Sequence, residues 1–156
     1  MFATKRTAVT IAALAMMAIP AAAQNTGADA TYRDISLSAG FTPDPFTINL
    51  QSGGSTNAEN LGGSCDGYIA NAPDVRVRYD AGSLPLIISV DSSSDTTLVV
   101  NAPDGRWYCD DDSGDGLNPS VRFNNPMSGR YEVWVGTYSS STLESATLQI
   151  SELYSQ

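Results

Sequence analysis

The sequence predicts an all-β protein, an antiparallel β-sandwich or jelly roll of about eight to ten short strands with one disulfide. Three observations predict it. Short stretches of alternating apolar and polar residues recur, clusters of Gly, Pro, Asp and Ser separate them, and no stretch keeps a helical period beyond one turn. Short strands at regular spacing with such turns are typical of sandwiches.

The first 23 residues are expected to be a signal peptide, outside the fold. Lys5 and Arg6 form a positive start, an apolar run covers residues 8–19, and Ala21–Ala23 fits a cleavage site before Gln24. A run of about twelve residues reaches about 18 Å as a helix, less than the roughly 30 Å of a hydrocarbon core. We expect no membrane span, and an exported protein of the bacterial periplasm or extracellular space.

The remaining 133 residues suffice for one domain. Residues 24–33 are small and polar and are expected to form a flexible leader, followed by a single domain over residues 34–156. Six arginines, no lysine and 17 acidic residues give this part of the chain a formal charge of −11. Such an acidic protein is not expected to bind nucleic acid or anionic lipid.

Turns, loops and alternating stretches along the chain predict where its strands begin and end. Two prolines in the turn at residues 40–45 place the first strands at a sheet edge, and residues 52–64 form a long Gly/Ser-rich loop. The nearly continuous apolar run at residues 84–90 is typical of a central strand. The expected strands are residues 35–38, 46–50, 65–70, 75–79, 84–90, 96–101, 106–109, 120–123, 130–138 and 143–153.

Alternation in two of these strands predicts which side chains face the core. The expected inward positions are Val75, Val77, Tyr79, Tyr131, Val133 and Val135. Glu132, Trp134 and Tyr138 then share the outer face. Trp134 and Tyr138, together with Trp107, are candidates to stack on a ligand such as a polysaccharide. The alternative is that these aromatics cover the sheet beneath the loop at residues 52–64, since large aromatics are usually buried.

Cys65 and Cys109 are the only cysteines, and in an exported chain they are expected to form a disulfide. The alternative, a thiol pair that binds metal, lacks other soft ligands because the chain has no histidine. The bond encloses 43 residues. On the loop-entropy model, closing such a loop stabilises the fold by about 4 kcal/mol.

The residues that are absent exclude most catalytic sites. Without histidine, neither a Ser-His-Asp nor a Cys-His site can form, and without lysine after the leader there is no Ser-Lys dyad. Asp112-Ser113-Gly114 spells a short aspartic-protease signature, but a run of acids and glycines lacks the apolar setting in which two carboxylates share a proton. We therefore expect no enzyme; a carboxylate-based secreted hydrolase is the alternative.

The densest chemistry lies at residues 107–116, where four aspartates follow two aromatics and a cysteine. Asp111, Ser113, Asp115 and Gly116 match the first half of a calcium loop, but Arg122 replaces its final glutamate. Oxygen ligands favour Ca2+ over transition metals. The expected ligands are Asp110, Asp111, Asp112, Asp115, Asp104 and Asp95; the alternative is a solvated acidic turn.

Residues 95–138 carry an ordered set of short motifs. Asp95 precedes an apolar strand, and then come Pro103-Asp104-Gly105, the acidic Ser-Gly loop, Asn118-Pro119, and a Ser-Gly-x-Tyr-x-Val-x-Val stretch at 128–135. This order resembles the bacterial pre-peptidase C-terminal domain, a jelly-roll module that follows secreted proteases. The resemblance implies a β-sandwich, export, calcium and a binding role, without proteolysis. The Cys65/Cys109 pair departs from that family.

Together these features predict a secreted, calcium-stabilised accessory module that binds a polysaccharide, protein or matrix ligand without catalysis. Besides the hydrolase, a structural cell-surface or matrix subunit is the other alternative. For that alternative, the Gly/Ser-rich loop and the outer aromatics would be the contact surfaces.

Overall fold

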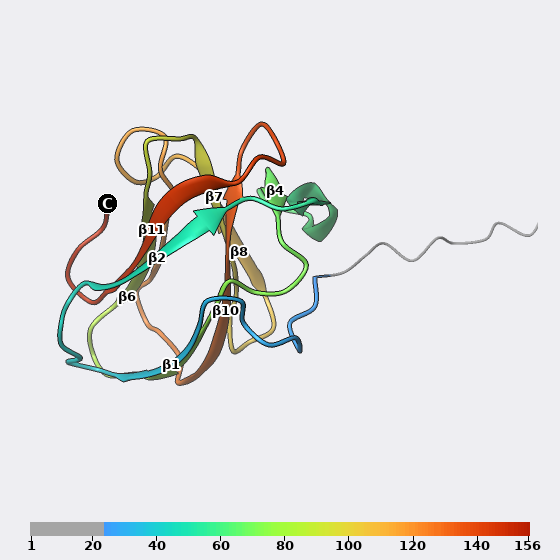
Figure 1. Cartoon of the computed structure of the whole chain (residues 1–156). Coiled ribbons are helices and arrows are strands. Elements are labelled where there is room, and N and C mark those ends of the chain that lie inside the picture. Colours follow the sequence, from blue (N-terminus) through green and yellow to red (C-terminus); the bar gives the residue numbers. More distant parts are fainter. Residues whose placement is uncertain (1–23) are drawn as a thin grey trace, which may run out of the picture.

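The computed structural model describes residues 24–156, so the expected signal peptide lies outside the described residues. Within that range the fold is all-β, as predicted: eleven strands and one 3-10 helix, η1 (Ala58–Leu61), build two packed sheets (Figure 1). The four-stranded sheet has the order β2 (Phe46–Ser52), β11 (Glu144–Ser151), β6 (Leu86–Asp91) and β9 (Ser120–Phe123). None of the helices in residues 24–156 has the length and apolar character to cross a membrane.

The seven-stranded sheet is arranged around one strand, β10 (Gly129–Thr137). One edge of β10 pairs with β7 (Thr96–Asn101), which in turn pairs with β8 (Trp107–Asp110). The other edge pairs first with β5 (Val75–Asp80) and then, at its end, with β4 (Tyr68–Ile69). Beyond these two strands lie β1 (Arg33–Ser38) and β3 (Thr56–Asn57).

Strand pairing departs from the prediction at one place, because β1 and β5 run parallel rather than antiparallel. Parallel neighbours need a long connection between them. Here β2, in the other sheet, and β3 and β4 intervene between β1 and β5 along the chain, so the connection is long enough.

The main core fills the space between the two sheets and follows the predicted alternation. Strands β5 and β10 contribute the six predicted inward positions, and the four-stranded sheet contributes the opposite layer. The central members of the core are Val75, Val77, Tyr79, Tyr131, Val133 and Val135, facing Ile48, Leu50, Leu86, Ile88, Val90, Leu148 and Ile150.

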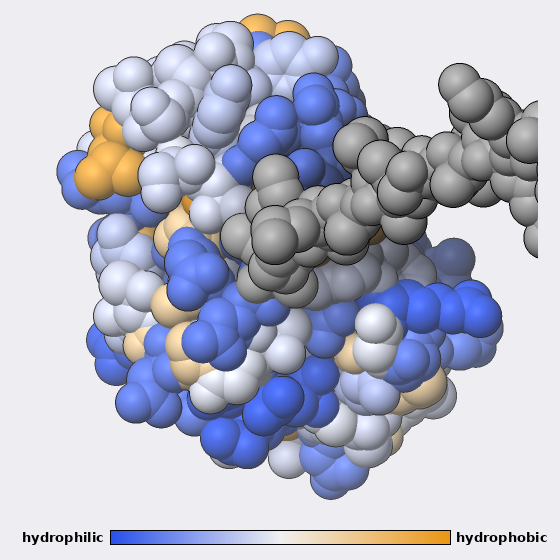
Figure 2. Space-filling model, turned by 90° about the vertical axis from the view of Figure 1, so that its right-hand side faces the viewer, coloured by the Kyte–Doolittle hydropathy of each residue, from blue (hydrophilic) through white to orange (hydrophobic). Residues whose placement is uncertain are grey.

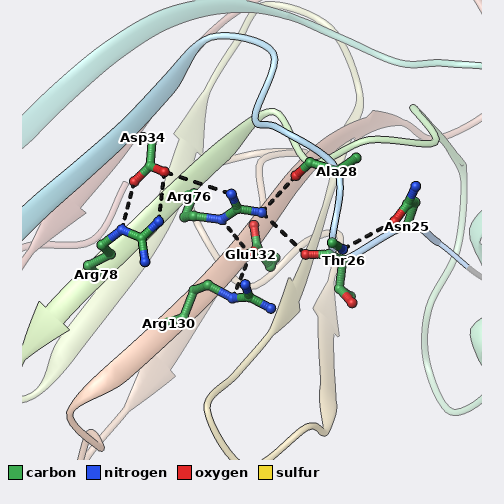
Figure 3. Close-up of polar contacts among 9 residues, drawn as sticks. Asn25, Thr26, Ala28, Asp34, Arg76, Arg78, Arg130 and Glu132 are labelled. Atoms are coloured by element: carbon green, nitrogen blue, oxygen red, sulfur yellow. Dashed lines mark hydrogen bonds and ion pairs between the residues drawn. The ribbon is translucent and has the colours of Figure 1, made fainter.

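A buried ion pair lies on the outer face of the seven-stranded sheet (Figure 3). Arg76 of β5 and Glu132 of β10 are register partners, and the Nε of Arg76 lies 2.7 Å from Oε1 of Glu132. The Nε of Arg130 forms a second ion pair with the same oxygen, at 2.9 Å. Removing one partner of such a buried pair typically costs about 3–5 kcal/mol, because the other charge stays buried.

The ion pair also explains why residues 24–33 do not form the expected flexible leader. Arg76 Nη2 donates to the carbonyl oxygens of Thr26 and Ala28, the latter at 2.7 Å (Figure 3). Gln24 is only 6% exposed, and its amide donates to the carbonyl oxygen of Ala70. The segment is thus docked along the sheet, and β1 begins at Arg33 within it.

Asp74 closes the gap on the edge of β10 between β5 and β4. Its Oδ2 accepts a hydrogen bond of 2.8 Å from the amide of Val135, and its own amide donates to the carbonyl of Val133. The residue is 3% exposed, and burial raises the pKa of this carboxyl group to about 7, against the opposing effect of the Val135 amide. The carboxyl group therefore accepts the hydrogen bond from the Val135 amide that a backbone carbonyl of a neighbouring strand would otherwise accept.

This burial predicts a pH-dependent stability. Between about pH 4 and 7 the unfolded chain releases the Asp74 proton while the folded chain keeps it, so the free energy of unfolding falls as the pH rises. The loss reaches at most about 4 kcal/mol and levels off above pH 7. Urea unfolding of wild type and Asp74→Asn at several pH values measures it, because the amide keeps the acceptor but does not titrate. Parallel pH profiles for the two proteins would contradict the assignment.

Candidate functional site

The predicted disulfide is present and joins a surface loop to the edge of the seven-stranded sheet. Cys65 and Cys109 are bonded, with their Cα atoms 4.9 Å apart. Cys109 belongs to β8, whereas Cys65 ends the segment that contains β3 and η1. The bond therefore fixes residues 53–67 over the outer face of the sheet.

Trp134 lies beneath this loop, which corrects its prediction as a ligand-binding residue. Its side chain is completely buried, in a second apolar cluster with Ala58, Cys65 and Ile69. The loop approaches closely because Gly54 has no side chain: a Cβ there would lie 2.2 Å from the Ile69 carbonyl carbon. Trp134 lies on the outer face of the sheet, as predicted. The loop covers that face, as the alternative proposed, so the ring is not exposed.

Trp107 lies at the border of this cluster and keeps part of its surface exposed. Its ring centroid is 5.4 Å from that of Trp134, with the planes tilted by 49°. Beside it is a hollow of about 310 Å³, here called the β8 hollow. Its lining comes from Gly62, Gly63, Ser64, Cys65, Trp107, Tyr108, Cys109, Asp110, Ser120 and Val121.

Tyr138 is the most exposed of the three predicted aromatics, at 43%. It lines a separate hollow of about 230 Å³, here called the Tyr138 hollow. Tyr68, Asn57, Glu59 and Asp66 lie around the same hollow. Aromatic rings, carboxylates and an amide group thus lie together in this hollow. Tyr68, Glu59 and Asp66 are not among the site residues predicted from the sequence.

Asp110 organises the acidic loop through its own hydrogen bonds. Its two oxygens accept from the Ser113 amide at 2.9 Å, the Ser113 hydroxyl at 2.6 Å and the Ser120 amide at 2.8 Å. The side chain thus links the end of β8 to the start of β9. This role gives the first predicted calcium ligand a structural function that needs no ion.

The six predicted calcium ligands do not form one site. Asp95 precedes β7 and lies near the end of β8, whereas Asp104 lies at the opposite end of both strands. Six strand residues separate these ends by about 20 Å. Asp104 instead accepts from the Arg106 amide and the Tyr108 hydroxyl, and these bonds lower the pKa of its carboxyl group, the Arg106 amide most. Across residues 24–156 no three acidic, Cys or His side chains are grouped as a metal site.

The other aspartates are crowded at the end of β8. Burial raises the pKa of Asp111, and the charges of Asp112, Asp110 and Asp66 raise it further. Burial, followed by the charge of Asp112, also raises the pKa of Asp95. Asp66 was not predicted to lie near the acidic loop. The predicted disulfide could have indicated this, because Asp66 follows Cys65 and the acidic loop follows Cys109.

Comparison with known proteins finds similarity at the level of solved structures. No family model and no curated protein match the sequence. The pre-peptidase C-terminal domain of a Bacillus anthracis collagenase is 16% identical, with a TM-score of 0.46 over 80% of this chain and 99% of that chain. The chain is similar to that domain. PliG of Aeromonas hydrophila, a periplasmic inhibitor of g-type lysozyme, is 14% identical, with a TM-score of 0.38 over 76% of this chain and 96% of that chain.

The resemblance predicted from the motifs therefore has a counterpart among solved structures. Both the motifs and the structure match indicate a β-sandwich like the pre-peptidase C-terminal domain. Identities of 16% and 14% with TM-scores below 0.5 give no argument about activity or ligand.

Removing the disulfide tests its role in holding the loop. We expect Cys65→Ser/Cys109→Ser to lower the free energy of unfolding by up to about 4 kcal/mol, because the unfolded chain gains the freedom of a 43-residue loop. Iodide quenching of tryptophan fluorescence should rise as Trp134 becomes accessible. Unchanged stability together with unchanged quenching would contradict the role of the bond as the anchor of the loop.

Proposed function

We propose that this protein is an exported, non-catalytic binding module that engages a neutral, polyhydroxylated ligand such as a saccharide in the Tyr138 hollow. The proposal rests on the exposed Tyr138 ring, which lies in a hollow lined also by Tyr68, Asn57 and two carboxylates. Aromatic rings bind the apolar face of a sugar, and the polar groups orient its hydroxyls. Glu59 and Asp66 would disfavour an anionic ligand.

The absence of a catalytic arrangement supports a binding role. The chain has no histidine. Its most deeply buried carboxylates have structural partners: Glu132 with Arg76 and Arg130, Asp74 with the Val135 amide, and Glu152 with the Tyr79 hydroxyl and the Gly40 amide. Asp112-Ser113-Gly114 lies in a turn where Asp112 and Ser113 are exposed, not in the dry setting that a shared proton needs.

The disulfide supports export to the periplasm or the extracellular space, because such bonds persist in oxidising compartments. On the face shown in Figure 2 the surface is mostly hydrophilic, and strongly hydrophobic colouring is confined to separate spots. That face suits a module that works in solvent and binds through local hollows rather than through a broad apolar interface.

Glycan-array binding with matched tyrosine variants tests the proposal. Tyr138→Ala should reduce binding about tenfold, whereas Tyr138→Phe should retain most of it, because the ring makes the contact. Tyr154→Ala is the control, since Tyr154 is also exposed, at 57%, but lies near the C-terminus. Equal binding by Tyr138→Ala and wild type, or cleavage of the bound glycan, would overturn the assignment.

We further propose that Ca2+ binds at Asp95, Asp111 and Asp112, where burial, and after it the charge of Asp112, raises the pKa of Asp95 and Asp111. Carboxylate oxygens suit this ion. Since no group of three is assembled as a metal site in the described residues, the loop would have to close around the ion.

Thermal melts with Ca2+ and with EDTA test the calcium proposal. An ion that binds only the folded chain, at a hundred times its dissociation constant, adds about 2.7 kcal/mol. Asp112→Ala should abolish this gain, Asp115→Ala tests the rest of the loop, and Mg2+ in place of Ca2+ controls for general charge screening. Melting curves that do not respond to Ca2+ in any of these proteins would refute it.

A further inference from the structure

Strand β8 forms an edge of the seven-stranded sheet. It pairs with β7 through the register Leu98–Asp110 to Asn101–Trp107, and no other described strand pairs with it. An edge strand presents a row of backbone donors and acceptors to which another extended chain can pair.

The hairpin geometry shows which backbone groups of β8 face outward. The amide of Ala102 donates to the carbonyl of Arg106, so these two residues form a hydrogen-bonded pair. Such pairs alternate along an antiparallel ladder. Tyr108 and Asp110 therefore bond to β7, whereas the N–H and C=O groups of Trp107 and Cys109 point to the free edge. Within residues 24–156 these outward groups have no hydrogen-bond partner.

The β8 hollow runs along this free edge. Gly62 and Gly63 form part of one wall without side chains, and Ser120 and Val121 of β9 form part of the other. Strand β9 is itself the last strand of the four-stranded sheet. The edges of the two sheets thus form a seam here, and a hollow of about 310 Å³ is lined by residues of both edges and of the segment 62–65.

The charge at the end of the seam is strongly negative. Asp66, Asp111 and Asp112 lie close enough together that the charges of Asp66 and Asp112 act on Asp111. None of the three is in an ion pair with a described residue; the salt bridges involve Asp34, Asp104 and Glu132 instead. Mutual repulsion of this kind is relieved by a cation brought from outside.

From this geometry we infer that the β8 edge binds an extended, Lys- or Arg-bearing peptide segment of a partner protein. The peptide backbone pairs with Trp107 and Cys109, and its basic side chains meet Asp66, Asp111 and Asp112. Strand addition to a sheet edge is an established mode of peptide recognition, in which backbone bonds give affinity and alternate side chains give specificity. The site shares Asp66 with the Tyr138 hollow and Asp111 and Asp112 with the proposed calcium site. Its backbone contacts, Trp107 and Cys109, belong to neither, and the inference does not depend on the saccharide proposal.

Amide hydrogen exchange of the whole protein tests the inference directly. The probe is the synthetic peptide acetyl-Lys-Thr-Lys-Val-Lys-Thr-Lys-amide, added in EDTA so that no divalent cation competes. Exchange at the Trp107 and Cys109 amides should slow by about tenfold or more, because both gain a bond. The Tyr108 and Asp110 amides should barely change, since β7 already pairs with them. This alternating pattern separates strand addition from general stabilisation.

Peptide and protein variants complete the test. A peptide with Glu in place of Lys, and one N-methylated at alternate residues, should not bind, because the first repels the aspartates and the second lacks donors. Asp111→Asn/Asp112→Asn should weaken the Lys peptide about tenfold at low salt, whereas Asp80→Asn/Asp91→Asn removes the same charge elsewhere and should not. Unprotected Trp107 and Cys109 amides at saturating peptide, or sedimentation showing that a second copy occupies the edge, would overturn the inference.

Discussion

The fold depends on the way strand β10 is satisfied along both edges. Residues 131–137 are all buried, so each of their backbone groups needs a partner. Strand β7 covers one edge, but β5 and β4 share the other, and neither reaches the middle. The Asp74 carboxyl group bonds to Val135 at this point. One buried side chain therefore allows the sheet to change its neighbour without leaving a central strand unpaired.

The same strand explains where the outer face of the seven-stranded sheet is covered and where hollows remain. Its outer face is closed at one end by Arg76, Glu132 and the docked N-terminal segment (Figure 3). At the other end it is closed by the disulfide-linked loop over Trp134. Both coverings remove the centre of the sheet from solvent. Hollows are left at the margins of the loop, where Tyr138 and Trp107 keep part of their surface exposed.

The acidic loop combines a structural and an electrostatic role. Asp110 uses its oxygens to connect β8 and β9, whereas Asp111 lies close to the charges of Asp112 and Asp66. A carboxylate that accepts several amide hydrogen bonds stabilises a turn, and one that faces other carboxylates attracts cations. Neighbouring aspartates in the sequence thus differ in their contacts, because the fold gives each one different surroundings.

Local sequence determined the all-β class, nearly every strand, the inward faces of β5 and β10, and the Cys65–Cys109 bond. Period-2 alternation and turn residues act over a few positions, and two cysteines allow one intramolecular pairing. Alternation assigns a side chain to a face but does not say what covers that face, so only the tertiary structure buried Trp134 and docked residues 24–33. It also separated Asp104 from Asp95 and brought Asp66 to the acidic loop, because strand direction and a disulfide set distances that residue order does not contain.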